Sequence, residues 1–160
     1  MITLIAAISY DNVIGINGQV PWNIPEDMKR FKEKTLDPPV IMGRRTYESL
    51  PEKFSPLPQR KNIVLSSSLK PQNRIYIARN MQKVFELTED LDSYVIGGRE
   101  IYELFLPHVN IMEITRVQGS FKGDTFFPSV KWKEWNLLEE EKKRSEDQKF
   151  SYSFLTYERI

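Results

Sequence analysis

The chain has 160 residues, and its 23 lysines and arginines nearly balance its 22 aspartates and glutamates, which gives no support for a nucleic-acid or membrane partner. The absence of cysteine excludes disulfides, thiol nucleophiles and thiolate metal sites, and a lone histidine, His108, excludes a two-histidine metal cluster. No apolar run approaches the roughly 18 residues of a membrane span, so we expect a cytoplasmic monomer with one domain over residues 1–160 and no metal.

The first predicted element is a strand over residues 3–9, because an unbroken apolar run is typical of a strand buried on both faces. Residues 10–19 follow as an irregular loop with Gly15 and Asn17-Gly18 as turn signals. Long loops between a central strand and a helix are more often functional than not, so we expect this loop to border a ligand.

A helix is predicted to begin at Pro25, since proline is tolerated in a first helical turn. Its apolar face carries Ile24, Met28 and Phe31, and Asp27 projects on that side because it lies four residues before Phe31. Its wet face carries four charged residues, Lys29, Arg30, Lys32 and Glu33. An acid against an apolar wall needs a partner or must hold a proton. The alternative is that Asp27 only complements the helix dipole.

Two adjacent arginines follow the next predicted strand, which covers residues 40–42. Gly43, Arg44, Arg45 and Thr46 precede a brief helix predicted over residues 47–50. A strand, a glycine, two cations and a helix start together suit a bound phosphate, although two arginines alone would also suit a solvated surface.

Two further strand ends suit an anion. The strand predicted over residues 62–65 ends in Ser66, Ser67 and Ser68, which would either bind an anion or simply form a turn. Gly97-Gly98 joins a buried strand to a helix predicted over residues 99–106, and glycine lets a phosphate approach such a helix end. The three-glycine fingerprint of a standard Rossmann domain is absent, so that fold is disfavoured.

The remaining elements complete an alternating pattern. Strands are predicted over residues 75–78 and 111–117, and an antiparallel pair over residues 135–142 and 150–157. Asn80 is predicted to cap a helix whose inward residues are Val84, Phe85 and Leu91, while Ile101, Tyr102 and Phe105 form the inner side of the later helix. We expect an α/β fold: a mainly parallel, mixed central sheet of about eight strands with an antiparallel C-terminal edge, flanked by about four helices.

At this point the residues resemble a known family, the dihydrofolate reductases, from end to end. The matching pieces are Leu4-Ile5-Ala6-Ala7, Val13-Ile14-Gly15, Pro21-Trp22-Asn23 with Pro25 and Asp27, Phe31, Val40-Ile41-Met42-Gly43-Arg44, Thr46, Pro56-Leu57, Arg60, Leu65-Ser66-Ser67, Ile96-Gly97-Gly98, Tyr102, Thr115 and Gly123-Asp124-Thr125. Each piece is weak alone, but the set in this order and spacing is specific to the family.

The resemblance implies an enzyme that reduces 7,8-dihydrofolate to 5,6,7,8-tetrahydrofolate with NADPH in one-carbon metabolism and that binds antifolates such as trimethoprim. It implies that Asp27 pairs with the pterin ring, that Trp22 holds a water nearby and that Arg60 binds the carboxylate of the glutamate tail. The substrate-binding residues that it implies are Ile5, Asp27, Met28, Phe31, Leu50, Leu57, Arg60, Ile96, Tyr102 and Thr115.

The resemblance places the nicotinamide beside Ala7 and the 10–19 loop, and the adenosine side, including the 2′-phosphate, beside the arginines and serines. The cofactor-binding residues that it implies are Ala7, Ile14, Gly15, Asn17, Gly18, Gly43, Arg44, Arg45, Thr46, Leu65, Ser66, Ser67, Arg79, Gly97, Gly98, Arg99, Glu100, Ile101, Tyr102 and Thr125.

Two other functions stay open at this stage. A pyrimidine reductase of riboflavin synthesis would share the fold and cofactor but should lack the stretch from Pro21 to Asp27. A non-catalytic pterin- or nucleotide-binding module would need only a pocket.

Overall fold

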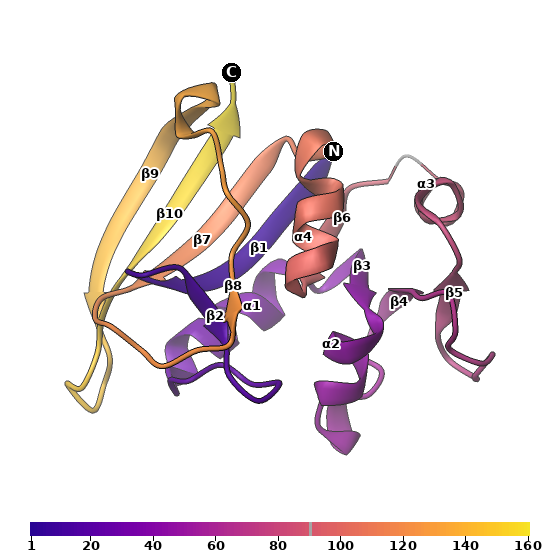
Figure 1. Cartoon of the computed structure of the whole chain (residues 1–160), viewed down its shortest axis with the longest axis horizontal. Helices are drawn as coiled ribbons and strands as arrows, with labels where there is room; N and C mark the ends of the chain where they lie inside the picture. Colours follow the sequence, from indigo (N-terminus) through magenta and orange to yellow (C-terminus); the bar gives the residue numbers. More distant parts are fainter. Residues whose placement is uncertain (90) are drawn as a thin grey trace.

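The apolar runs of the chain become neighbouring strands of one sheet (Figure 1). The computed structural model describes residues 1–89 and 91–160. The strands of the main sheet are β1 (Ile2–Ser9), β3 (Asp37–Gly43), β4 (Arg60–Leu65), β5 (Tyr76–Ala78), β6 (Ser93–Gly97), β7 (Ile111–Val117), β9 (Trp135–Arg144) and β10 (Ser151–Arg159). A second, two-stranded sheet pairs β2 (Val13–Gly15) with β8 (Thr125–Phe126).

Four α-helices and three 3₁₀ turns complete the described residues. The helices are α1 (Pro25–Lys34), α2 (Arg44–Ser49), α3 (Met81–Thr88) and α4 (Arg99–Phe105). The 3₁₀ turns are η1 (Glu52–Phe54), η2 (Leu106–His108) and η3 (Trp132–Glu134). The α/β class, the eight strands of the main sheet and the four helices agree with the fold predicted from the sequence.

The main sheet has the order β5-β4-β3-β6-β1-β7-β10-β9. The six strands from β5 to β7 pair in parallel, whereas β10 is antiparallel to both β7 and β9, which is the predicted antiparallel edge. Since parallel strands share a direction, the carboxyl ends of all six meet at one edge of the sheet. Ligands in such folds bind at that edge.

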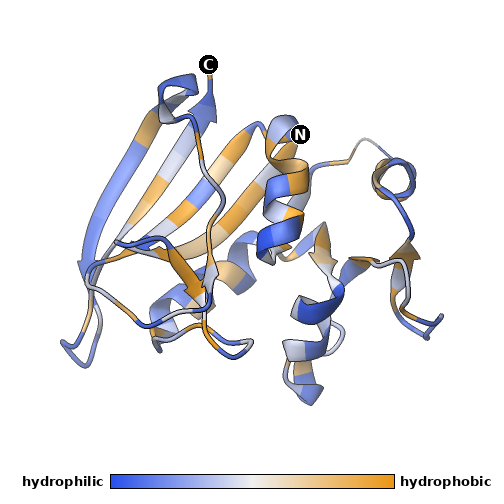
Figure 2. Ribbon diagram, viewed as in Figure 1, coloured by the Kyte–Doolittle hydropathy of each residue, from blue (hydrophilic) through white to orange (hydrophobic). Residues whose placement is uncertain are grey.

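Alternating side chains divide the core between the two faces of the sheet. One apolar cluster joins Leu4 and Ile8 of β1 to Val84 of α3 and to Ile101 and Phe105 of α4. On the other face, Val40 and Met42 of β3 pack with Phe31 of α1 and Tyr47 of α2. Helices therefore cover both faces, α1 and α2 on one and α3 and α4 on the other. Figure 2 shows apolar colour concentrated in the central strands, while β9 is mostly hydrophilic.

Local signals explain where three helices begin. Pro25 occupies the first turn of α1, as predicted, and Asn80 Oδ1 accepts a hydrogen bond from the Lys83 backbone N–H (2.9 Å) at the start of α3, as predicted. The second helix, however, begins at Arg44 and not at residue 47. The extended backbone of Gly43 serves as its N-cap residue, a position that glycine fills well, so the helix starts directly after β3.

Three other expectations were wrong. β3 begins at Asp37, before the two prolines that were predicted to precede it. Its pairing with β4 is irregular between Asp37 and Val40, because prolines lack the N–H that a regular ladder needs. Leu91 was predicted to face inward but is 55% exposed, since α3 ends at Thr88. The 10–19 loop is not wholly irregular, because it contains β2.

The charged run at residues 139–144 lies on β9, the outer strand of the sheet, and its residues are exposed, which is typical of a solvated strand edge. Within residues 1–89 and 91–160, none of the helices is long and apolar enough to cross a membrane.

Candidate active site

The acid singled out by the sequence lies where α1 meets the sheet. Thr115 of β7, which is 4% exposed, donates a hydrogen bond from its hydroxyl to Asp27 Oδ1 over 2.6 Å. Burial raises the pKa of Asp27 above its usual value, while the Thr115 hydrogen bond and the charge of Arg30 partly oppose that rise. Asp27 can therefore hold a proton closer to neutral pH than a surface aspartate can.

Next to this acid, the neighbouring strands β1 and β6 separate from one another. Their parallel pairing ends at Leu4 and Val95, and beyond it the Tyr102 hydroxyl lies 2.8 Å from the Ile5 carbonyl oxygen and 3.0 Å from that of Ile96. Burial, and after it the negative charge of Asp27, raises the pKa of Tyr102, so the phenol stays protonated and able to donate. The phenol thus ties together the two strand ends that were predicted to contact substrate.

Four of the apolar residues predicted to bind substrate lie in one cluster. Phe31, Leu50, Leu57 and Ile96 all pack in the cluster around Val40 and Met42. Asn62 holds Leu57 in place, since its side chain accepts from the Leu57 N–H and donates to the Leu57 carbonyl, both over 2.9 Å. Met28 differs from the expectation for an apolar face, since it is 52% exposed.

Trp22 and Arg60 flank α1 at its two ends. Trp22 is 7% exposed and belongs to an apolar cluster with Val117 of β7 and Phe154 of β10. Arg60 donates to the Thr35 hydroxyl and the Pro58 carbonyl, each over 2.8 Å, which uses two of its five donors. Burial lowers the pKa of Arg60 below its usual value, but arginine remains charged at neutral pH.

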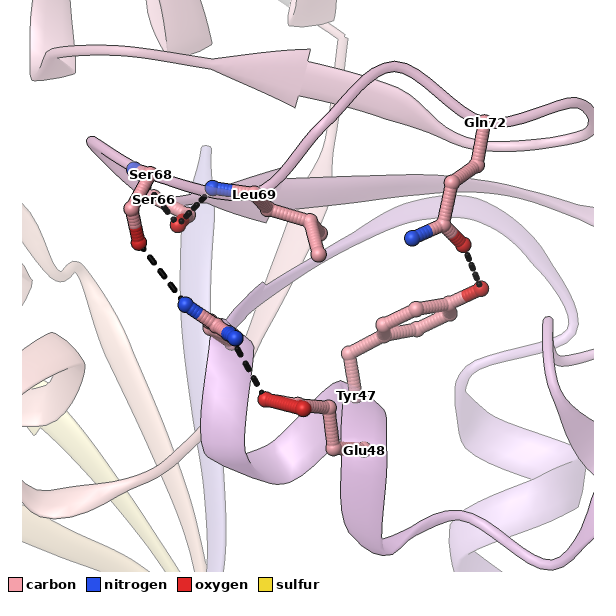
Figure 3. Close-up of polar contacts among 7 residues, drawn as sticks. Tyr47, Glu48, Ser66, Ser68, Leu69 and Gln72 are labelled. Atoms are coloured by element: carbon pink, nitrogen blue, oxygen red, sulfur yellow. Dashed lines mark hydrogen bonds and ion pairs between the residues drawn. The ribbon is translucent and has the colours of Figure 1, made fainter.

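A cation and several hydroxyls gather where β3 and β4 end (Figure 3). Arg44 pairs through Nε with Glu48 Oε1 and donates through Nη1 to the Ser68 hydroxyl, each over 2.8 Å. The Ser66 hydroxyl accepts from the N–H groups of Ser68 (3.2 Å) and Leu69 (3.0 Å). The serine run therefore forms a turn, and that turn presents a hydroxyl to Arg44.

The neighbouring predicted cofactor residues surround this turn. Arg79 donates to the Ser66 carbonyl over 3.0 Å, and Arg45 and Ser67 are exposed beside it. Thr46 lies near Gly98, since a Cβ placed on Gly98 would be 3.6 Å from its hydroxyl oxygen. The ends of β3, β4 and β6 thus bring their arginines, hydroxyls and glycines to one region.

Two glycines in this region are required by their surroundings. A Cβ on Gly43 would lie 2.9 Å from Cγ1 of Ile101, so α4 approaches β3 more closely than any larger residue would permit. Gly97 has a φ of +121°, which L-residues rarely adopt. Beyond them, Arg99 donates to the Phe126 carbonyl over 3.0 Å and Glu100 is exposed.

The 10–19 loop is held by an acid. Asp124 accepts from the Asn17 N–H over 2.9 Å and from the Thr125 hydroxyl over 2.8 Å, and its own N–H donates to the Gly15 carbonyl over 3.0 Å. The Asn17 bond and then the Thr125 bond lower the pKa of Asp124, so it stays ionised. Asp124 connects the loop to β8 and thereby shapes the segment that carries Gly15, Asn17 and Gly18.

Sequence reasoning missed several members of the site. Asp124 was noticed within a motif but not assigned a role, and Ser68 was left open between an anion site and a simple turn. Arg30 was placed on the wet face of its helix, yet its side chain is only 19% exposed and pairs with the buried Glu113. The available signal for Glu113 was an acid in the middle of a strand, β7, that is buried on both faces. In the part of the chain that the structure describes, no three histidine, aspartate or glutamate side chains gather as a metal site would require.

An acid with a raised pKa beside the carboxyl edge of a mainly parallel sheet, with arginines and hydroxyls at the neighbouring strand ends, is the arrangement of a nucleotide-binding α/β enzyme. A family model described as "Dihydrofolate reductase" matches residues 1–159. The chain belongs to the dihydrofolate reductase family.

Individual relatives agree over nearly the whole chain. The dihydrofolate reductase of Haemophilus influenzae is 37% identical over 155 residues, covering 96% of this chain and 95% of the relative. That of Neisseria meningitidis serogroup A is 39% identical over 163 residues, covering 98% and 96%. A solved structure of dihydrofolate reductase from Enterococcus faecalis, complexed with NADP(H) and RAB-propyl, is 29% identical, covers 99% of this chain and 96% of that one, and has a TM-score of 0.90.

The predicted family and enzyme class are thereby confirmed. The activity is the NADPH-dependent reduction of 7,8-dihydrofolate to tetrahydrofolate. This family assignment replaces the riboflavin-pathway reductase and the non-catalytic binding module.

Proposed function

We propose that Asp27 is the residue that handles the proton in dihydrofolate reduction. Bound NADPH supplies the hydride that C6 of the substrate receives, which leaves N5 of the pterin ring in need of a proton. Asp27 has the chemistry for that task, since it is half-buried, its pKa is raised by burial, and Thr115 fixes one of its oxygens. This raised pKa at a fixed carboxyl group is the observation on which the proposal rests.

The substrate would lie with its pterin ring between Asp27 and the parted ends of β1 and β6. Its apolar middle would contact the cluster of Phe31, Leu50, Leu57 and Ile96, with Ile5 and Met28 beside it. Arg60, at the far end of α1, would bind the glutamate carboxylate as a bidentate partner. Trp22 would hold a water near Asp27 and so provide a route for the proton.

NADPH fits the other strand ends. The guanidinium of Arg44 and the hydroxyl of Ser68, already within 2.8 Å of one another, offer a cation and a donor to the 2′-phosphate, with Arg45, Ser67 and Arg79 nearby. Gly43 and Gly97 end β3 and β6, and they carry no side chain that would stand between the backbone and the pyrophosphate. Ala7 and the loop held by Asp124 would border the nicotinamide. The first test of this arrangement is an assay of NADPH consumption in the presence of dihydrofolate. The near-ultraviolet absorbance of NADPH is monitored with and without trimethoprim.

We further propose that one chain, folded as one domain, works as a monomer in the cytoplasm, where NADPH and folates are found. All the proposed contacts to substrate and cofactor come from a single chain, so catalysis requires no second copy.

Arg44→Ala is expected to weaken the binding of NADPH far more than the binding of NADH. Loss of a charged hydrogen-bonding group facing a phosphate costs about 1.5–3 kcal/mol, which corresponds to a rise of roughly 10- to 100-fold in KM for NADPH. The KM for NADH, which lacks the 2′-phosphate, should stay unchanged. Arg44→Lys keeps the charge but loses the planar fork, so its KM for NADPH should be intermediate. Equal losses for the two nucleotides would show that Arg44 does not read the phosphate.

A further inference from the structure

Beneath the Asp27 site, four side chains form a buried polar cluster around Glu113. Glu113 of β7 is 8% exposed and receives three partners: Arg30 Nη2 lies 3.1 Å from its Oε2, the Thr156 hydroxyl donates to the same oxygen over 2.8 Å, and Lys34 Nζ lies 3.7 Å from Oε1. Two of these partners come from α1 and one from β10. The cluster therefore joins α1 to the sheet.

The cluster lies next to the hydrogen bond between Thr115 and Asp27. Asp27 and Arg30 are three residues apart on α1 and so share a face of the helix, and Thr115 and Glu113 are two residues apart on β7 and so share a face of the sheet. Two polar contacts consequently join the same two elements one turn apart, Thr115 to Asp27 at 2.6 Å and Arg30 to Glu113 at 3.1 Å. The positive charge of Arg30 favours the ionised carboxyl group and lowers the pKa of Asp27 against the effect of burial.

Stability alone does not account for a charged pair in this place. A buried ion pair seldom stabilises a fold more than apolar residues of the same size. Arg30 also stacks on Phe154, with its guanidinium carbon 4.1 Å from the ring centroid, and an apolar side chain would provide that packing equally well. A cation neutralises Glu113, and in addition it supplies an electric field at Asp27, which an apolar side chain would not. The side chains of Arg30 and Glu113 are 19% and 10% exposed, so solvent ions screen that field weakly.

We propose that Arg30 is a positioning residue for Asp27: Glu113 and Thr156 hold its guanidinium one helical turn from the Asp27 carboxyl group, and its charge sets the pH at which that group works. The proposal rests on the proposed role of Asp27 in catalysis. Glu113 has a second effect, since its negative charge offsets part of the field of Arg30. Further titratable groups face the two acids: Tyr102 on α4 and Tyr152 on β10 for Asp27, and Lys34 on α1 and Tyr94 on β6 for Glu113.

The test compares pH profiles of kcat/KM for dihydrofolate in the whole enzyme. Arg30→Met removes the cation but keeps an unbranched side chain over Phe154, and it should move the midpoint of the profile to higher pH by about half a unit. Glu113→Gln leaves Arg30 less neutralised and should move the midpoint to lower pH. Lys29→Met removes one positive charge from the exposed side of the same helix and should leave the midpoint in place, because exposed charges are screened.

Arg30→Met leaves a buried acid with fewer partners, so the variant itself could fold poorly. The double variant Arg30→Met/Glu113→Gln carries neither charge and covers that case, and its midpoint should also lie above that of the wild type. Thermal unfolding with and without NADPH checks that each variant is folded.

A second measurement separates this proposal from the proposed function. Carbon-13 NMR of labelled aspartate follows the Asp27 carboxyl group in the free enzyme, and the signal missing from Asp27→Asn identifies it. Shifts of opposite sign for Arg30→Met and Glu113→Gln support the proposal even if Asp27 proves dispensable for turnover. Superimposable titrations of the wild type, Arg30→Met and Lys29→Met, or shifts of the same sign for the two cluster variants, would overturn it and leave the cluster a purely structural contact.

Discussion

Asp27→Asn is expected to lower kcat with dihydrofolate by roughly 10²- to 10⁴-fold at neutral pH, the usual contribution of a positioned general acid or base. Asparagine has the shape of aspartate and can still accept the Thr115 hydrogen bond, so the fold and the Kd for NADPH should be unchanged. It cannot take up a proton, however. The remaining activity should rise as the pH falls, because solvent then supplies the proton that the side chain no longer provides.

Glu26→Gln is the matched control for this prediction. Glu26 is the preceding acid of the same helical turn, and its Oε1 accepts the Glu146 N–H over 2.9 Å, a bond that glutamine can also accept. The same chemical change one residue away should therefore leave turnover near that of the wild type. Full activity of Asp27→Asn, or an equal loss in Glu26→Gln, would remove Asp27 from the proposed role.

Asp27→Asn should also stabilise the protein near neutral pH. Burial raises the folded-state pKa of Asp27 above its unfolded value, so the folded state binds the proton more tightly. The stability linked to that proton is fully present below the unfolded pKa and is lost as the pH rises through the folded one. Since asparagine carries no ionisable group, the gain in Tm of Asp27→Asn over the wild type should be larger at neutral than at acidic pH.

Gly97→Ala is expected to reduce the free energy of unfolding by about 2–4 kcal/mol and to abolish tight NADPH binding. An L-residue at its φ of +121° costs about 1–3 kcal/mol, and the new methyl group would lie 3.2 Å from the hydroxyl oxygen and 3.3 Å from Cζ of the buried Tyr102. Displacing that ring disturbs its contacts with Ile5 and Ile96. Urea unfolding and NADPH titration measure the two effects.

Gly18→Ala separates backbone strain from the clash. Gly18 also has a positive φ, +79°, but a Cβ there meets no described heavy atom within 4 Å, so only the backbone cost of about 1 kcal/mol is expected. If both variants unfold at the same urea concentration, the contact with Tyr102 contributes nothing.

The elements that sequence reasoning predicted best are those with a strong local signal. The sequence over residues 111–117 was read as alternating and does form β7, and α1 begins at Pro25 because proline suits a first turn. Shorter elements carry too little signal: β2 and β8 span three and two residues and exist because they pair with each other across a long stretch of chain. The early start of α2 depended on a glycine acting as a cap, which sequence alone also allows to be a simple turn.

The residues of the site also differ in how well the sequence predicted them. The family resemblance placed both Asp27 and Thr115 among the substrate-binding residues, but no local pattern joins residues 88 positions apart. Arg30 was misplaced for a related reason. Helical periodicity assigns a charged residue to solvent, whereas the inward acid on β7, Glu113, makes burial of that cation favourable. Such pairs become visible only when two distant segments are brought into register.

The phenol between β1 and β6 has more hydrogen-bond acceptors around it than it has hydrogens to donate. Tyr102 carries one O–H hydrogen, and two carbonyl oxygens, those of Ile5 and Ile96, lie within reach of it. Because a hydroxyl donates one hydrogen at a time, only one of the two carbonyl oxygens can accept from the phenol at any moment. A heterocycle bound there through an amino group could donate hydrogen bonds to these carbonyl oxygens. An oxygen on the ring in the same place would instead face them as a third acceptor. A substrate analogue that exchanges such an oxygen for an amine would gain an attachment point that the natural ligand lacks.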